Sequence, residues 1–156
     1  MKNKLINLLT DKKMHISTAE SCTGGLLSAK LTDVPGASAV IDECIVTYSN
    51  EAKMRELYVK EETLANFGAV SVETAEEMCR GICRHTGADV GIGITGIAGP
   101  GGGSAEKPVG TVCIGVCVNG RAEVECCRFD GDRASVREQS CEWAINKAVE
   151  MVGKYS

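Results

Sequence analysis

Long apolar runs are absent from this sequence of 156 residues. No segment approaches the roughly 18 consecutive apolar residues that span a membrane, so no membrane partner is expected. Residues 1–13 alternate charged side chains with leucine and isoleucine, without the apolar core and cleavage site of a signal peptide. We therefore expect a cytoplasmic protein.

An excess of positive charge is also absent. The chain holds 17 lysine and arginine residues against 21 aspartate and glutamate residues, which gives a formal net charge of -4. Domains that bind nucleic acid usually carry a basic face, so no nucleic-acid partner is expected. The length and a content of 44% apolar residues are ordinary for one globular domain, which we expect to cover residues 1–156.

Metal-ligand spacing is missing as well. Only two histidines occur, His15 and His85, and none of the nine cysteines forms a C-x-x-C pair. A zinc site built from convergent ligands is therefore not expected, and no metal is predicted. The odd cysteine count and the irregular spacing do not fit a disulfide scaffold, so we expect free thiols that act as small buried apolar residues.

Hydrophobic periodicity predicts helices and strands that alternate along the first half of the chain. Asn119-Gly120, between two apolar runs, predicts a β-hairpin near the end. Helices are expected at about residues 4–13, 26–35, 50–57, 61–67, 71–86 and 134–154, and strands at about residues 16–19, 40–48, 90–95, 109–118 and 122–129. Asn50 is expected to cap the third helix, and Asp130 or Asp132 the last one. This order predicts an α/β fold, a three-layer α/β/α sandwich with a mixed sheet.

A turn rich in hydroxyls and glycine follows the first predicted strand. It contains Ser21, Cys22, Thr23, Gly24 and Gly25, and a helical pattern begins directly after it. A strand-to-helix junction directs backbone N–H groups and the positive end of the helix dipole toward one spot. Such a spot stabilises the oxyanion formed beside a nucleophile, or holds a phosphate, so the turn is predicted to be a ligand site.

Residues 95–104 form the second candidate site, because five of these ten residues are glycine. Backbone amides in such a loop can approach an anion closely, although glycine loops also serve as plain connectors. The loop is not a P-loop, since no Gly-Lys-Ser/Thr follows the glycines. Gly91, Gly93 and Gly96 have the spacing of a dinucleotide-binding motif, but they lie within a predicted strand rather than after it, and no helix follows. Lys107 is a further candidate for anion binding.

Lys53 is the candidate general base for Ser21. His15 precedes the strand at the end opposite Ser21, so a Ser-His-Asp triad is not expected. Lysine can accept a proton when its site lowers its pKa from about 10.4. Lys53 follows a strand end, near Tyr48, that can meet the Ser21 turn at one edge of the sheet. Composition alone favours a solvated helix lysine instead, so both interpretations stay open.

These segments together resemble the C-terminal domain of the competence/damage-inducible protein family CinA and its stand-alone form, nicotinamide-nucleotide amidase. The matching segments are, in chain order, residues 18–25, 46–53, 68–71, 96–103, 107–112 and 131–133. The resemblance spans nearly the whole chain. Longer family members carry an additional N-terminal domain that is missing from this sequence, so we do not expect the pyrophosphatase-like role of that domain.

The resemblance implies an α/β/α sandwich, a homo-oligomer and the hydrolysis of nicotinamide mononucleotide to nicotinate mononucleotide and ammonia, a step of pyridine nucleotide salvage. It implies Ser21 as nucleophile and Lys53 as base, with Tyr48 beside them. The residues it assigns to substrate binding are Thr23, Gly24, Gly25, Asn50, Thr95, Gly96, Gly99, Gly101, Gly102, Gly103, Ser104 and Arg133. The implied partner is a small nucleotide, and no metal or organic cofactor is required.

Two alternative functions stay open at this point. A non-catalytic nucleotide-binding module, regulatory or adaptor in role and linked to competence or the DNA damage response, would keep both glycine segments without needing Ser21 and Lys53 as a pair. A cysteine hydrolase would use Cys22, whose pKa the start of a helix can lower. The shortage of histidine disfavours the second, because cysteine nucleophiles usually pair with a histidine base.

Overall fold

Five strands form one mixed sheet in the computed structural model, which describes residues 1–156. The strands are β1 (Ile16–Glu20), β2 (Ile41–Val46), β3 (Val90–Gly96), β4 (Thr111–Val118) and β5 (Arg121–Arg128). Their spatial order is β2-β1-β3-β4-β5, with β1 parallel to both β2 and β3 and the remaining pairs antiparallel. The carboxyl ends of β1, β2 and β3 therefore meet at one edge of the sheet.

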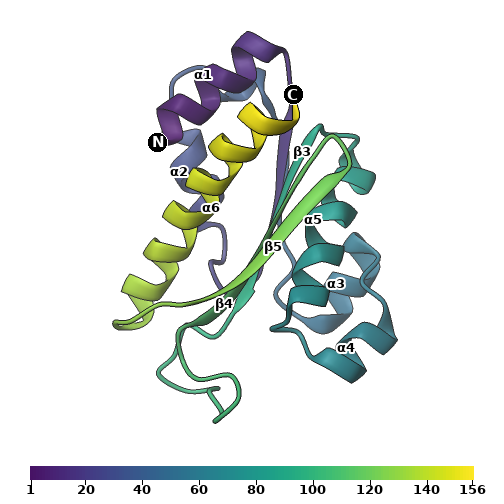
Figure 1. Cartoon of the computed structure of the whole chain (residues 1–156), viewed down its shortest axis with the longest axis vertical. Helices are drawn as coiled ribbons and strands as arrows, with labels where there is room; N and C mark the ends of the chain where they lie inside the picture. The colour runs from purple at the N-terminus through teal and green to yellow at the C-terminus, as the bar shows by residue number, and fades with distance from the viewer.

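Helices cover both faces of this sheet, as Figure 1 shows. On one face lie α1 (Lys2–Lys12), α2 (Leu26–Thr32) and α6 (Arg133–Tyr155), and on the other lie α3 (Asn50–Leu57), α4 (Glu61–Phe67) and α5 (Val72–Thr86). The predicted α/β/α sandwich with a mixed sheet is confirmed. The Asn119-Gly120 hairpin is confirmed too, and both of its residues have the positive φ that such a turn requires.

Several element ends differ from the sequence prediction. The helix expected to reach residue 35 ends at Thr32, and a short 3₁₀ turn, Ala37–Ala39, follows it. The second strand ends at Val46 rather than at residue 48, because Ser49 already caps α3 by accepting a hydrogen bond from the Ala52 amide at 3.1 Å. Asn50, expected as the cap, is therefore the first residue of that helix. Ser71 and Asp132 cap α5 and α6 through their side chains.

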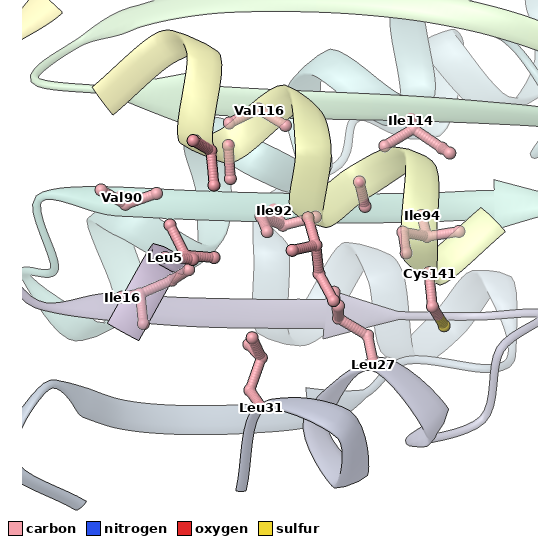
Figure 2. Packing of buried hydrophobic residues seen from close by; sticks show 14 of the residues in the cluster. Leu5, Ile16, Leu27, Leu31, Val90, Ile92, Ile94, Ile114, Val116 and Cys141 are labelled. Atoms are coloured by element: carbon pink, nitrogen blue, oxygen red, sulfur yellow. The ribbon is translucent and has the colours of Figure 1, made fainter. Parts of the chain in front are cut away.

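Two apolar clusters fill the space between the sheet and its helices. The larger one joins β1, β3 and β4 to α1, α2 and α6, and Figure 2 shows Ile16, Ile92 and Ile94 of the sheet packed with Leu5 and Leu27 of the helices. The smaller one lies beneath α3 and α5 and contains Ala19, Leu57, Val59, Met78 and Ile82. Since β1 contributes Ile16 to one cluster and Ala19 to the other, it packs against both helix layers of the sandwich.

Side chains at the end of β1 alternate between the two faces, as the pleat of a strand dictates. Glu20 turns toward α2, where its carboxylate accepts hydrogen bonds from backbone amides. The next residue, Ser21, turns toward α3, where its hydroxyl contacts Lys53. This alternation separates a structural carboxylate from the candidate nucleophile by one residue.

The expectation of free thiols is wrong for two cysteines. Cys113 and Cys126 lie directly opposite each other on β4 and β5 and form a disulfide. Their sequence spacing did not reveal this pairing, because the hairpin register decides which residues of two antiparallel strands face each other. The remaining seven cysteines are free: Cys22, Cys44, Cys79, Cys83, Cys117, Cys127 and Cys141.

Gly81 sets the distance between α5 and α3, the helix that carries Lys53. A Cβ added to Gly81 would overlap the backbone carbonyl of Leu57, the last residue of α3. We predict that Gly81→Ala lowers the free energy of unfolding by roughly 1–3 kcal/mol, the usual cost of overpacking. Gly153→Ala in α6 is the matched control, because nothing lies within 4 Å of its Cβ position.

Alanine favours a helix over glycine by about 1 kcal/mol, so the control is expected to be neutral or stabilised. Urea denaturation of both variants measures the difference. Equal free energies of unfolding for Gly81→Ala and Gly153→Ala would mean that α3 moves without cost and that Gly81 does not fix its position.

Candidate active site

A cavity of about 280 Å³ lies at the sheet edge where β1, β2 and β3 end. The side chains and loops around it come from all three strand ends, from α3, from the glycine loop and from α6. Its lining residues are Ser21, Cys22, Tyr48, Asn50, Lys53, Ala69, Val70, Thr95, Gly96, Ile97, Ala98, Gly99, Gly101, Gly102 and Arg133. Ligands of α/β proteins commonly bind at the carboxyl ends of parallel strands, and this cavity has that position.

Lys53 and Ser21 form a buried pair at the floor of this cavity. The register that sets Glu20 beside Val46 brings the turn after β1 next to the start of α3. Lys53 is only 1% exposed, and its Nζ lies 2.9 Å from the Ser21 Oγ. The alternative of a solvated helix lysine is therefore wrong, and the expected meeting of the two strand ends is confirmed.

Two backbone carbonyls hold the Lys53 amine in place. Its Nζ donates to the carbonyl oxygen of Thr47 at 2.9 Å and to that of Tyr48 at 3.3 Å. Burial disfavours the ammonium form and lowers the pKa of Lys53 from its ordinary value to about 8. A neutral amine has two hydrogens and one lone pair, so with both hydrogens on carbonyls the lone pair faces the Ser21 hydroxyl. The pair can thus transfer a proton from serine to lysine.

The start of α2 differs from what the sequence analysis expected. Glu20, fully buried, accepts hydrogen bonds from the amides of Gly25, Leu27 and Ser28 and from the Ser28 hydroxyl. The positive end of this helix is therefore occupied by a side chain of the protein and does not face a ligand.

Three residues of this turn that were expected to bind substrate lie outside the cavity. The Gly24 amide donates to the carbonyl of Ser21, and Thr23, Gly24 and Gly25 do not line the cavity. The amides of Cys22 and Thr23 have no acceptor within the chain. Cys22 lines the cavity, whereas Thr23 is fully buried, so the Cys22 N–H is the donor of the turn that a developing oxyanion can reach.

The glycine loop contributes to the cavity through part of its length only. Gly101 and Gly102 line it, and nothing lies within 4 Å of the Cβ position of Gly101. Gly99 also lines the cavity and Gly103 does not, and both allow the loop to pack closely against Val109, where a Cβ on either would clash. The glycines at these two positions are therefore explained by close packing within the chain, without any contact to a ligand.

Gly103 and Ser104 lie outside the cavity. Ser104 exchanges hydrogen bonds with the backbone of Lys107, and the Lys107 amine donates to the carbonyl of Phe67. Lys107, proposed from sequence as an anion ligand, therefore joins the loop to the end of α4. Thr95 and Gly96 line the cavity as expected, and the Thr95 hydroxyl donates to the carbonyl of Ala69 at 2.9 Å.

Arg133 and Tyr48 form the outer part of the cavity. The Arg133 guanidinium donates to the carbonyl of Gly99 at 2.7 Å and lies 3.5 Å from the Tyr48 hydroxyl. Tyr48 is 61% exposed, and it is the backbone carbonyl of this residue, not the phenol, that contacts Lys53. No aspartate or glutamate lines the cavity, so Arg133 and Lys53 face it without a competing carboxylate.

Cys22 lies beside the candidate nucleophile but has a different environment. Burial raises the pKa of its thiol to about 11, so the thiolate is scarce near neutral pH. No group of three or more His, Cys, Asp or Glu side chains is arranged to hold a metal ion. None of the helices combines the length and apolar character needed to cross a membrane.

Arg137 is the residue of the site that the sequence analysis missed. Its guanidinium donates to the carbonyls of Cys22 and Thr23, at 3.2 and 2.8 Å. It belongs to α6, 115 residues after Cys22, and in the sequence it looks like one more polar position of that helix. Only the helical spacing from Arg133, four residues earlier on the same face, could have drawn attention to it.

Comparison with known proteins places the chain in a family. Residues 1–152 match the family described as the CinA C-terminal domain. A putative competence-damage inducible protein of Clostridium acetobutylicum is 54% identical over 132 residues, which is 85% of this chain and 32% of that protein. A CinA-like protein of Kosmotoga olearia is 51% identical over 142 residues, 91% of this chain and 34% of the relative. The chain thus spans about a third of the length of these curated relatives.

Solved structures share the fold over nearly their full length. A competence/damage inducible protein from Agrobacterium tumefaciens has a TM-score of 0.94 at 42% identity, covering 96% of this chain and 92% of its own. A CinA superfamily protein from Klebsiella pneumoniae has a TM-score of 0.95 at 38% identity, covering 99% and 96%. The family resemblance stated from the sequence is confirmed.

The lowered pKa of Lys53 has a consequence for stability. The folded pKa, about 8, lies below the value of 10.5 expected in the unfolded chain, so between these pH values the unfolded state binds the extra proton. Stability rises with pH wherever the unfolded state binds more protons. We predict that the free energy of unfolding of the parent rises from pH 8 to 10.5 relative to Lys53→Met, and is flat relative to it below pH 7.

Urea titrations of both proteins across this range measure the difference, and the other titrating groups cancel because both chains carry them. Parallel pH profiles for the parent and Lys53→Met would show that the buried amine titrates normally. The proton transfer described above would then lack its base.

Proposed function

Because the chain belongs to the CinA C-terminal domain family, we propose that it hydrolyses the carboxamide of nicotinamide mononucleotide. The products are nicotinate mononucleotide and ammonia, so the reaction would serve pyridine nucleotide salvage. The curated relatives are named only as competence-damage inducible or CinA-like proteins, so the amidase activity is a proposal from the site. The observation that carries it is the 2.9 Å contact between the Lys53 amine and the Ser21 hydroxyl in a buried cavity.

The acylation step follows from the geometry of this pair. Ser21 Oγ attacks the carboxamide carbon while its proton passes to the Lys53 Nζ. The oxyanion that develops is held by the unpartnered amide of Cys22, which lines the cavity directly after Ser21. The Lys53 ammonium then gives its proton to the leaving nitrogen, which departs as ammonia and leaves a Ser21 ester of the pyridine carboxylate.

Deacylation uses the same groups in reverse. A water molecule gives a proton to Lys53 and attacks the ester carbon, and the Ser21 oxygen leaves and recovers its proton from the lysine. An amine with a pKa of about 8 suits both halves, since it gains and loses a proton readily near neutral pH. No step needs a metal ion or an organic cofactor.

The outer cavity supports recognition of an anionic substrate. Arg133 is bound to a backbone carbonyl and a phenol rather than to a carboxylate, so its charge is not neutralised within the cavity. Guanidinium groups bind phosphate through charge-assisted hydrogen bonds. We assign the phosphate of the nucleotide to Arg133, with the amides around Gly101 and Gly102 as further donors.

The two alternative functions are weaker on this geometry. A binding module without catalysis has no need for a buried amine, which is costly to desolvate, directly against a serine hydroxyl. A cysteine hydrolase would need an ionised Cys22, and burial holds its pKa at about 11. Both alternatives are outcomes of the experiment that follows.

Replacement of Ser21 tests the nucleophile. We predict that Ser21→Ala abolishes ammonia release from nicotinamide mononucleotide while nucleotide binding is retained, because the hydroxyl takes part in covalent chemistry only. Cys22→Ala, the matched control one residue later, is expected to keep most of the turnover. Both are measured by ammonia release with product identification, and binding by calorimetry.

An active Ser21→Ala together with an inactive Cys22→Ala would replace the serine mechanism by a cysteine one. A parent protein that binds the nucleotide and releases no ammonia would favour the non-catalytic binding module.

Truncated substrates test the phosphate assignment. Binding energy from the phosphate helps to hold the carboxamide against Ser21, so nicotinamide riboside and free nicotinamide should lose both turnover and affinity. We predict that Arg133→Met lowers kcat/KM for the nucleotide by roughly 10- to 100-fold, the loss of one or two charge-assisted hydrogen bonds, and leaves the riboside little changed. Arg128→Met is the control, because Arg128 bonds only the carbonyl of Glu106 on an exposed loop.

The decisive measurement is kcat/KM for the nucleotide and the riboside on the parent and both variants. Equal values for the two substrates on the parent, or an unchanged ratio in Arg133→Met, would mean that Arg133 does not read the phosphate.

A further inference from the structure

Three free cysteines lie together in the layer between α5 and the sheet. Cys79 and Cys83 are four residues apart on α5 and therefore share one face of that helix, and Cys117 belongs to β4, against which α5 packs. None of the three lines the cavity beside Ser21. The candidate active site therefore does not account for them.

A glycine of the neighbouring strand brings Cys83 against the sheet. A Cβ added to Gly91 of β3 would lie 2.5 Å from the Cys83 Sγ, so the sulfur occupies the space that a larger side chain would need. Gly91 lies directly opposite Cys117 in the β3–β4 register. Opposite residues of antiparallel strands have Cβ positions about 4.5–5.5 Å apart on the same face. The Cys83 sulfur is thus beside the Cys117 side chain, and the two thiols share a hydrogen bond.

This hydrogen bond divides the proton unequally between the two sulfurs. Donation from the Cys83 thiol lowers the pKa of Cys117 to about 7, and the Arg80 guanidinium and the Gly120 amide act in the same direction. The same bond, together with burial, raises the pKa of Cys83, so the proton stays on Cys83. Arg80 is held close by, because it donates to the Gly120 carbonyl at 2.9 Å in the hairpin turn after β4. A thiolate near neutral pH, in contact with a second thiol, is typical of redox-active cysteine pairs.

We infer that Cys83 and Cys117 form a redox modification site, at which a hydroperoxide converts the two thiols into a disulfide that joins α5 to β4. Cys83 is partly exposed and Cys117 only 2% exposed, so Cys83 is the sulfur that a small oxidant reaches from solution. Cys83 lies in the last turn of α5, where a small shift of the chain can shorten a thiol contact to the S–S bond length of about 2.05 Å.

Cys79 is not a member of this pair. It is fully buried, and its thiol donates to the carbonyl of Glu76 at 3.3 Å. Burial also raises its pKa well above the ordinary value, which keeps its thiol protonated. Because neither sulfur of the pair lines the cavity, the modification site is independent of the amide hydrolysis proposed at Ser21.

The oxidation takes two steps with hydrogen peroxide. The Cys83 sulfur attacks one peroxide oxygen while its proton passes to the Cys117 thiolate, the O–O bond breaks, hydroxide leaves, and Cys83 becomes a sulfenic acid. The Cys117 sulfur then attacks the Cys83 sulfur, the S–S bond forms as the S–O bond breaks, and the departing hydroxide takes the Cys117 proton to become water. The two sulfurs lose two electrons in total, and the two peroxide oxygens gain them.

A packing role for both cysteines is the competing explanation, because a free cysteine also serves as a small buried apolar residue. The two roles differ in reactivity. Packing alone predicts thiols that react slowly and independently of each other. A redox pair predicts that each sulfur depends on the other, since Cys117 removes the proton of Cys83 and then completes the disulfide.

The experiment compares the parent with Cys83→Ser, Cys117→Ser and the control Cys127→Ser. Each protein is mixed with a small excess of hydrogen peroxide at pH 7, and samples taken over time are alkylated at the remaining thiols. Peptide mass spectrometry then identifies linked cysteines and gives the rate at which the free Cys83 thiol disappears. Cys127 is also partly exposed, but it lies opposite Val112 on β4 and burial raises its pKa to about 11, so its replacement leaves the pair intact.

We expect the parent to give a peptide pair linked through Cys83 and Cys117, which dithiothreitol converts back to two thiols. Cys127→Ser should form the same link at the rate of the parent. In Cys117→Ser the oxidation of Cys83 should be at least about 10-fold slower, because a pair with a pKa of about 7 is half ionised at pH 7, whereas a lone thiol with a pKa of about 8.5 is ionised to only a few per cent. Cys83→Ser should give no linked peptide that contains Cys117.

Equal rates of Cys83 oxidation in the parent and in a folded Cys117→Ser would overturn the inference in favour of packing. A parent in which peroxide consumes the Cys83 thiol without linking it to Cys117, or links either sulfur to Cys79 instead, would overturn it as well. These last two results need only the parent, so they decide the matter even if a serine variant does not fold. Release of ammonia from nicotinamide mononucleotide is measured separately, and its absence contradicts the proposed function without affecting the assignment of the cysteine pair.

Discussion

Burial of the Lys53 amine is the constraint on which the rest of this structure depends. An amine taken out of water needs hydrogen-bond partners, and no carboxylate lies near enough to pair with it. Its partners are instead two backbone carbonyls at the end of β2 and one serine hydroxyl at the end of β1. Those three partners lie together only if β1 and β2 are parallel, in register at Glu20 and Val46, and if α3 begins shortly after the strand. Gly81 and the Ser49 cap serve that placement, because they bring α3 close to α5 and fix where it starts.

A division between the two faces of the sheet follows from this constraint. The face with α3 holds the reacting side chains, whereas the face with α2 and α6 holds the charges that fix the backbone, Glu20 and Arg137. The pleat of β1 makes the division possible, since consecutive residues point to opposite faces. The structural carboxylate is thereby kept away from the lysine, whose pKa it would otherwise raise. A nearby anion would defeat the base, so the separation is as important to the proposed chemistry as the contact between Lys53 and Ser21.

The parts of this arrangement that are local in the sequence could be predicted, and those that depend on distant contacts could not. Helical spacing, the hairpin at Asn119-Gly120 and the strand ends before Ser21 and Lys53 are local patterns, and they were enough to bring the candidate nucleophile and base together. The sequence analysis did not predict that Glu20 binds the amides at the start of α2. A glutamate beside a polar turn is usually exposed, and only the packing of α2 against β1 buries this one. Arg137 and the Cys113–Cys126 disulfide depend on which residues meet across the sheet, which no local pattern encodes. The prediction for the glycine loop was incomplete for a related reason. Gly99 and Gly103 leave room for Val109, and the sequence does not show that Val109 packs there.

The molecule as a whole is negatively charged, whereas its cavity contains basic and no acidic side chains. The distance of each charge from the substrate decides which of the two affects binding. A chain with net charge -4 repels an anionic nucleotide in bulk solution. At physiological ionic strength, however, exposed charges are screened beyond about 8 Å, so carboxylates scattered over the surface contribute little inside a cleft. The cavity itself contains Arg133 and Lys53 and no acidic residue. Within it the substrate phosphate would meet the Arg133 cation in a partly desolvated space, where charge interactions are stronger than in water. Local lining therefore outweighs overall charge, and an acidic protein can still select an anionic substrate.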